Sequence, residues 1–127
     1  MGKHVHRVST AKSHDGTLIH YEYTKAGPRT TPLILLHGLG GNSSSWRYLR
    51  GKPGVIIVDL RNHGRNTRES IFSFDSCVDD MLAIVQKERI KKCSIAGNCL
   101  GGIIGAEFKK KYSILVDKFI LISPWSR

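Results

Sequence analysis

Short apolar runs recur along the chain and predict the strands of a central sheet. Each run is nearly continuous rather than alternating, which is typical of strands buried on both faces of a parallel sheet. The runs cover residues 33–37, 55–60, 93–96 and 118–122. Upstream, residues 5–9 and 18–23 are expected to form two shorter strands, because the sequence His14-Asp15-Gly16 between them is a hairpin signal.

Segments of helical periodicity separate these runs. The apolar residues between 74 and 85 recur at i, i+3, i+4, i+7, i+8 and i+11, which predicts an amphipathic helix. A second helix is expected over residues 100–112 and a short one over 43–49. The alternation predicts one α/β domain over residues 1–127, with a mostly parallel sheet, flanking helices and an N-terminal antiparallel hairpin. In such sheets, functional groups gather at the carboxyl ends of the strands.

The chain is strongly basic, with 20 Lys and Arg residues against 10 Asp and Glu residues and a net charge of +10. A nucleic-acid partner is one explanation for such a charge. The densest groups, at 87–92 and 109–111, lie at predicted helix ends, where cations complement the helix dipole. No aromatic residues are interleaved with them as a stacking platform. We therefore expect a solvated basic surface and no nucleic-acid partner.

The cysteines bear on the cellular compartment and on metal binding. The chain has three cysteines, Cys77, Cys93 and Cys99. Their odd number and irregular spacing favour reduced thiols and a cytoplasmic location. The sequence contains no CxxC pair, so it does not indicate a structural zinc site. The neighbouring histidines His4 and His6 are interpreted as incidental. We therefore expect no metal and no cofactor. No apolar run is long enough to span a bilayer, and the N-terminal residues lack the apolar core of a secretory signal.

The sequence IAGNCLGG, residues 95–102, has the spacing G-x-C-x-G between a predicted strand and a predicted helix. A nucleophile at such a point needs a sharp turn, and side chains at Gly97 or Gly101 would collide with that turn. The N–H groups at the start of the helix would stabilise negative charge that develops at Cys99. A glycine-rich turn without chemistry is the alternative. A phosphate-binding loop is not indicated, because neither G-x-G-x-x-G nor G-x-x-x-x-G-K-[ST] is present.

A second glycine-rich turn, His37-Gly38-Leu39-Gly40-Gly41, follows the strand predicted at 33–37. Glycines at this point let the backbone turn its N–H groups toward a site. In acyl-transfer chemistry, one oxyanion donor is the N–H of the residue after the nucleophile, here Leu100. The second donor comes from an earlier loop, here most naturally the N–H of Leu39.

Three ordered segments together resemble the α/β-hydrolase fold superfamily. They are LILLHGLGGNSSSW, VIIVDLRNHGRN, and SIAGNCLGGIIGAEF with FILISP, and the likeness extends from about Leu18 to Pro124. The resemblance implies a partial α/β-hydrolase fold that reaches about the sixth family strand, so the C-terminal strands are missing. It also implies hydrolysis of a small ester, thioester or lactone, with Cys99 in place of the usual serine nucleophile. Asn62 stands where the family often has glycine, which is a minor departure.

The resemblance also implies an acid and a histidine after the nucleophile, and here the chain departs from the family. No histidine follows Cys99, and the only later carboxylates are Glu107 and Asp117, neither expected at the carboxyl end of a strand. His63 and His37 are expected to make structural hydrogen bonds rather than to act as a base. The acid and base are therefore absent from this chain, which alone is expected to be inactive or feeble.

A non-enzymatic role on the same scaffold is the alternative function. The missing strands would leave an apolar sheet edge exposed, and such edges attract partners. This interpretation predicts self-association or a stable partner chain.

Overall fold

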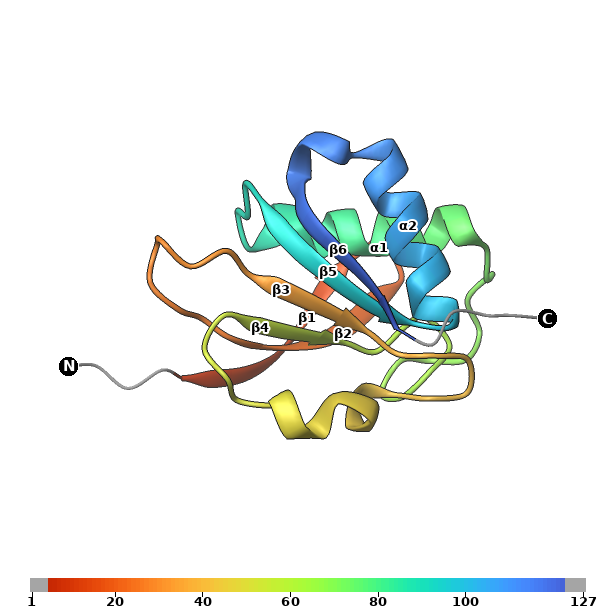
Figure 1. The fold of residues 1–127 in the computed structure, drawn as a ribbon. Coiled ribbons are helices and arrows are strands. Elements are labelled where there is room, and N and C mark those ends of the chain that lie inside the picture. The colour runs from red at the N-terminus through yellow and green to blue at the C-terminus, as the bar shows by residue number, and fades with distance from the viewer. Residues whose placement is uncertain (1–4, 123–127) are drawn as a thin grey trace.

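The computed structural model describes residues 5–122, which form a six-stranded mixed sheet in the order β1-β2-β4-β3-β5-β6 (Figure 1). The strands are β1 (His6–Lys12), β2 (Leu18–Thr24), β3 (Leu33–Leu36), β4 (Val55–Val58), β5 (Cys93–Asn98) and β6 (Val116–Ile122). The helices are α1 (Phe74–Lys87) and α2 (Leu100–Lys111), with two 3-10 segments, η1 (Ser43–Leu49) and η2 (Ser113–Leu115). His4 and the Ser123-Pro124 end of the last motif lie outside the described residues.

The sheet is parallel in its centre and antiparallel at one edge. Leu33 of β3 pairs with Val55 of β4 on one side and with Ser94 of β5 on the other, and β6 extends the parallel part beyond β5. β1 and β2 form an antiparallel hairpin, and β2 joins β4 with Tyr21 opposite Val58. The predicted α/β architecture with an N-terminal hairpin is confirmed.

Both faces of the sheet are covered, which explains the continuous apolar runs. Helices α1 and α2 lie on one face and η1 on the other (Figure 1). Because successive side chains of a strand point to opposite faces, Ile34 is buried on the α1 and α2 side and Leu35 on the η1 side. The cluster under η1 is small, with Leu35, Ile57 and Ala96 packed against Trp46 and Leu49, among others.

All six strands differ in extent from the sequence prediction, by one residue in β2 and β3 and by two or more in β1, β4, β5 and β6. β1 runs from residue 6 to 12 rather than 5 to 9, because its pairing with β2 continues to Lys12 opposite Leu18. β4 ends at Val58 rather than residue 60, and the Asp59 carboxylate turns to η1 and the following loop. β6 begins at Val116, so Asp117 lies inside the strand, at its amino end, and not before it.

The helix predicted over residues 43–49 is a 3-10 segment. Its backbone is interrupted at Trp46, where φ is −112° and ψ is 21°. The Asn42 side chain caps its start by accepting the Ser44 N–H at 2.8 Å. No helix within residues 5–122 is long and apolar enough to cross a membrane.

The C-terminal end of α1 has the hydrogen bonds of a Schellman motif. The Arg89 N–H donates to the Gln86 carbonyl at 3.1 Å, and the Ile90 N–H donates to the Val85 carbonyl at 2.9 Å. This motif places Arg89 in the left-handed region, with φ of 55°. Glycine is the usual residue at that position, and an L-residue costs about 1 kcal/mol more there.

Candidate functional site

Cys99 lies at the junction of β5 and α2 in a strained backbone conformation. Its φ is 51° and its ψ is −113°, a region that residues other than glycine rarely occupy. Such strain persists only where the surroundings hold it, and it is concentrated at functional sites. The Cys99 N–H donates to the Ile122 carbonyl of β6 at 3.3 Å, and the Cys99 carbonyl accepts from the Ile103 N–H at 3.1 Å. The turn is thus anchored to both the sheet and the helix.

Gly97 and Gly101 permit this turn because no side chain fits at either position. A Cβ on Gly97 would lie 2.4 Å from the Gly101 carbonyl oxygen. A Cβ on Gly101 would lie 2.4 Å from the Leu36 carbonyl oxygen and 2.6 Å from that of His37. Both contacts are with backbone atoms, which cannot rotate away. The predicted collision at these two glycines is confirmed.

The loop after β3 lies against the Cys99 turn. A Cβ on Gly38 would lie 3.5 Å from the Cβ of Cys99, so the two backbones are close neighbours. Within the loop, the Gly40 N–H donates to His63 Nε2 at 3.0 Å and the Gly41 N–H donates to the Gly38 carbonyl at 3.0 Å. No acceptor within residues 5–122 takes the N–H of Leu39. The N–H of Leu39 is therefore unpaired in this part of the chain.

Leu100 is the first residue of α2, so its N–H has no partner inside the helix. The sequence predicts the N–H groups of Leu39 and Leu100 as the two oxyanion donors, and that assignment stays a prediction. The side chain of Leu39 is 64% exposed, whereas that of Leu100 is buried.

Both histidines near the site are occupied by structural hydrogen bonds. His37 is buried, its Nδ1 donates to the Gly38 carbonyl at 2.7 Å, and its Nε2 accepts the Leu60 N–H at 2.9 Å. Burial lowers the pKa of His37, which keeps the ring neutral and fits this tautomer. His63 Nδ1 donates to the Arg61 carbonyl at 2.9 Å, and its Nε2 holds Gly40. These bonds shape the loops, as expected from the sequence.

The Asp59-Arg61-His63 group is the centre of a structural network. Arg61 is 1% exposed, and its guanidinium binds both carboxylate oxygens of Asp80, at 2.6 and 2.9 Å, and the Asp15 carboxylate at 2.8 Å. This arginine therefore joins the β1–β2 hairpin to α1. The Asp59 carboxylate accepts the Ser43 N–H at 2.7 Å and so holds the start of η1.

Asn62 explains the minor departure from the family pattern. Its φ is 64°, which is the left-handed region where glycine is preferred and asparagine is the next best residue. Its side chain also closes the loop, because Nδ2 donates to the Ser70 carbonyl at 2.7 Å and Oδ1 accepts the Ser70 N–H at 3.1 Å. Asparagine therefore fits the position where the resemblance implies that glycine is frequent.

The thiols differ in accessibility. Cys77 and Cys93 are buried, and burial raises the pKa of Cys77 to about 12 and that of Cys93 to about 11. Cys99 is half-buried. Within residues 5–122, no group of three or more His, Cys, Asp or Glu side chains is arranged to hold a metal ion.

The two carboxylates that follow Cys99 in the sequence lie away from it in the fold. Glu107 is exposed on α2, and Asp117 is exposed near the amino end of β6, so neither lies with Cys99 at the carboxyl ends of the strands.

Asn98, which sequence reasoning did not single out, precedes Cys99 directly. Its Oδ1 is buried and has no hydrogen-bond partner among the described residues. The only sequence signal was a polar residue at the end of an apolar strand.

Comparison with known proteins gives this geometry a family context. The profile of the alpha/beta hydrolase fold family matches residues 31–127. An sn-1-specific diacylglycerol lipase of Xenopus tropicalis is 32% identical over 108 residues, which cover 80% of this chain and 33% of the lipase. The structure of the meta-cleavage product hydrolase of Pseudomonas fluorescens IP01 superposes with a TM-score of 0.78 at 29% identity, over 91% of this chain and 44% of that one. An N-acyl homoserine lactone degrading enzyme, Est816, superposes with a TM-score of 0.82 at 23% identity, over 91% of this chain and 45% of that one.

The chain is shorter than these proteins. It spans a third of the length of the lipase and less than half of each superposed structure. The matched part holds the Cys99 turn and the loop before it.

Proposed function

This chain belongs to the alpha/beta hydrolase fold family, and on that premise we propose that Cys99 is the nucleophile of a hydrolase acting on a small ester, thioester or lactone. The observation that carries the proposal is the strained conformation of Cys99, with φ of 51°, held between two glycines that admit no side chain. A turn without chemistry has no need of such strain. The meta-cleavage product hydrolase and the diacylglycerol lipase support hydrolytic chemistry on this scaffold.

The proposed reaction has two steps. The Cys99 sulfur attacks the carbonyl carbon, while the N–H groups of Leu39 and Leu100 donate hydrogen bonds to the oxygen that becomes negative. The bond to the leaving group then breaks, the leaving group departs with a proton, and a thioester remains on Cys99. Water attacks this thioester and releases the acid and the thiol. A histidine outside residues 1–127 would move the protons in both steps.

The chain alone is expected to form the thioester but to hydrolyse it slowly, because loss of the base costs several orders of magnitude in the family's triads. With p-nitrophenyl acetate, we expect a burst of about one p-nitrophenolate per chain, followed by slow turnover. Mass spectrometry should find the acetyl group on Cys99. The Cys99→Ala variant should lose the burst, and Cys99→Ser should show a smaller one because a hydroxyl depends more on a base. An equal burst from Cys99→Ala would refute the nucleophile.

A second candidate function, a binding module that pairs with another chain, is favoured by the outer edge of β6. Within the described residues β6 pairs with β5 on one side only, and Ile120, Leu121 and Ile122 are 50%, 47% and 37% exposed. Exposed apolar strand edges pair readily with further strands. We propose that this edge takes a strand from a partner chain or from a second copy, with or without hydrolytic activity.

Sedimentation velocity over a range of concentrations tests the second candidate. We expect association that weakens in an Ile120→Lys variant, because a charge on an edge strand opposes strand pairing. A Val8→Lys variant serves as the matched control, because Val8 lies on β1 at the opposite edge of the sheet and is 56% exposed, against 50% for Ile120. A monomer at all concentrations would rule out pairing between copies. Loss of association in both variants alike would show that β6 is not the interface.

A further inference from the structure

Two adjoining hollows lie at the end of the sheet opposite to Cys99, where the loops enter the parallel strands. One has a volume of about 580 Å³ and is lined by Arg7, Lys25 and Lys87, among others. The other has a volume of about 380 Å³ and lies between the 25–32 loop and the 88–92 loop. Tyr23, Lys25 and Glu88 line both, so the two form one continuous feature, which we call the basic hollow.

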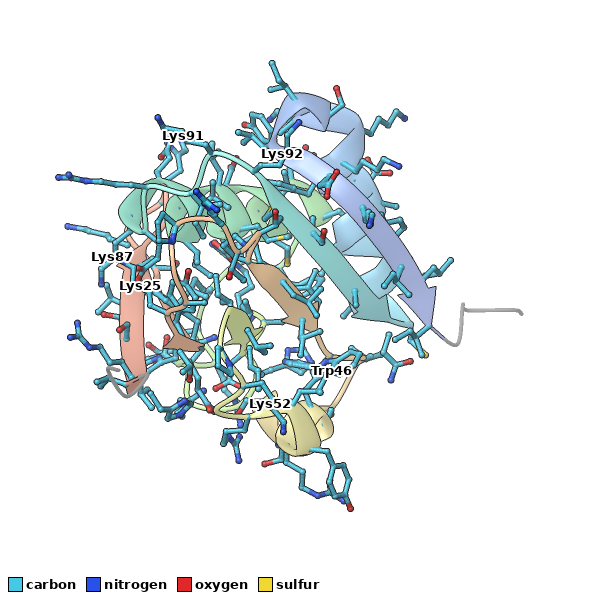
Figure 2. The ribbon with its side chains drawn as sticks, turned by 60° about the vertical axis from the view of Figure 1, so that its left-hand side comes forward. Lys25, Trp46, Lys52, Lys87, Lys91 and Lys92 are labelled. Carbon is cyan, nitrogen blue, oxygen red and sulfur yellow. The ribbon has the colours of Figure 1, made fainter. Side chains whose placement is uncertain are left out.

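The fold assembles the basic hollow from separate parts of the sequence. The loop before β3 contributes Lys25 and Arg29, and the loop before β5 contributes Arg89, Lys91 and Lys92. Figure 2 shows Lys25 and Lys87 close together on the side of the molecule that also carries Lys91, whereas Lys52 lies apart near η1. Lys25 and Arg29 lie far in the sequence from the basic group at 87–92. The strand order brings them together, because β3 and β5 are neighbours in the sheet.

The basic hollow has little negative charge of its own. Glu88 is the acidic residue among its lining side chains, and its carboxylate accepts a hydrogen bond from the Tyr21 hydroxyl. That bond leaves the negative charge of Glu88 in place, but seven lysine and arginine side chains in the lining outnumber it. The lysine and arginine side chains around it therefore produce a concentrated positive field over a concave surface, which favours the binding of anions.

Arg89 gives an independent indication that this end of the molecule is adapted to a ligand. Its φ of 55° lies where glycine is preferred at the end of a helix. A residue that departs from such a local preference without a structural gain indicates function. Here the departure adds a guanidinium to the lining of the hollow, which also includes Lys25 and Lys92. Guanidinium groups bind phosphate oxygens in pairs, with a geometry that lysine lacks.

We propose that the basic hollow binds a soluble small molecule that carries two or more phosphate groups. The volumes of the two hollows lie in the range of small-molecule sites. The site is separate from the proposed hydrolytic centre, since it lies at the opposite ends of the same strands. Single-stranded nucleic acids and anionic membranes fit the basic hollow less well. Tyr23, the aromatic residue of the lining, is 9% exposed and so offers no platform on which bases could stack. Val5 is the one large apolar side chain of the lining that is exposed, which is too little apolar surface to insert into a membrane.

Inorganic tripolyphosphate is the probe for this site, and calorimetric titration of the 127-residue chain at low ionic strength is the measurement. We expect saturable binding with one molecule per chain. The double variant Lys91→Gln/Lys92→Gln should bind about tenfold more weakly, corresponding to about 1.4 kcal/mol. The matched control is Lys109→Gln/Lys110→Gln, which removes the same charge from the end of α2, outside both hollows. It should bind like the unchanged chain.

Arg89→Gly is the decisive variant, because its effects on binding and folding should have opposite signs. Glycine suits the left-handed backbone, so the urea midpoint of unfolding should stay constant or rise while tripolyphosphate binding weakens. Three results would overturn the proposal: no binding of tripolyphosphate, equal weakening in the Lys109/Lys110 control, or unchanged affinity in Arg89→Gly. Binding of a single-stranded RNA or of anionic phosphatidylserine vesicles without binding of tripolyphosphate would also overturn it, in favour of a macromolecular partner.

Discussion

At the scale of single residues, the Cys99 turn depends on glycines rather than on polar side chains. A Cβ at Gly101 would lie within 2.6 Å of two carbonyl oxygens of the β3 strand end. Gly101→Ala is therefore expected to destabilise the fold by about 1–3 kcal/mol, as overpacking of a filled site does. Urea unfolding followed by circular dichroism measures this loss. The Gly27→Ala variant is the control, because a Cβ there meets nothing within 4 Å. Equal unfolding midpoints in both variants would contradict this view of the turn.

Several residue roles were predictable from the sequence, and others were not. The spacing G-x-C-x-G between a strand and a helix predicted the collisions at Gly97 and Gly101, because those collisions are local. The buried Asn98 oxygen and the left-handed Arg89 were not foreseen. The burial of the Asn98 side-chain amide and the backbone conformation of Arg89 depend on which elements pack nearby. A single sequence does not contain that information.

At the scale of elements, the loop after β4 holds its neighbours through Asp59. Burial opposes the charge of this carboxylate, but hydrogen bonds from the Arg65 guanidinium and from the Ser43 and Arg65 N–H groups outweigh it, so the pKa of Asp59 is lowered. A group with a lowered pKa in the folded state contributes stability above its unfolded pKa, about 3.9 for Asp. That stability is lost as the pH falls through the folded pKa.

The free energy of unfolding should consequently decrease as the pH falls below about 4, and decrease less steeply in an Asp59→Asn variant. Chemical denaturation at a series of pH values gives both slopes. Glu107→Gln, which changes an exposed carboxylate on α2, should leave the slope as it is in the unchanged chain. The same slope in Asp59→Asn and in the unchanged chain would show that Asp59 does not contribute to acid sensitivity.

The elements themselves were largely predictable, and their ends were not. Continuous apolar runs predicted the four parallel strands, because burial on both faces leaves no room for alternation. The segment 43–49 was expected to be a helix but is a 3-10 segment broken at Trp46. Trp46 and Leu49 pack on the small cluster around Leu35. Such packing depends on the strands that lie under η1, which the sequence of the segment does not reveal.

At the scale of the whole molecule, the net charge of +10 is unevenly placed. Repulsion within the basic hollow should destabilise the folded chain at low ionic strength. Thermal unfolding between about 0.01 M and 0.2 M sodium chloride should show a rising midpoint, since the screening length shortens over that range. The rise should be smaller in Lys91→Gln/Lys92→Gln than in Lys109→Gln/Lys110→Gln. A midpoint that falls with salt, or equal rises in the two variants, would contradict this distribution of repulsion.

The hydrogen bond between the Cys99 N–H and the Ile122 carbonyl gives the outer strand a mechanical role. Ile122 ends β6, whose outer edge pairs with no other strand among the described residues. Any strand that joins this edge would restrict the motion of β6 and, through this bond, the backbone of Cys99. The rate at which iodoacetamide alkylates Cys99 would thus report on events at the sheet edge, and assembly would tune the reactivity of its thiol.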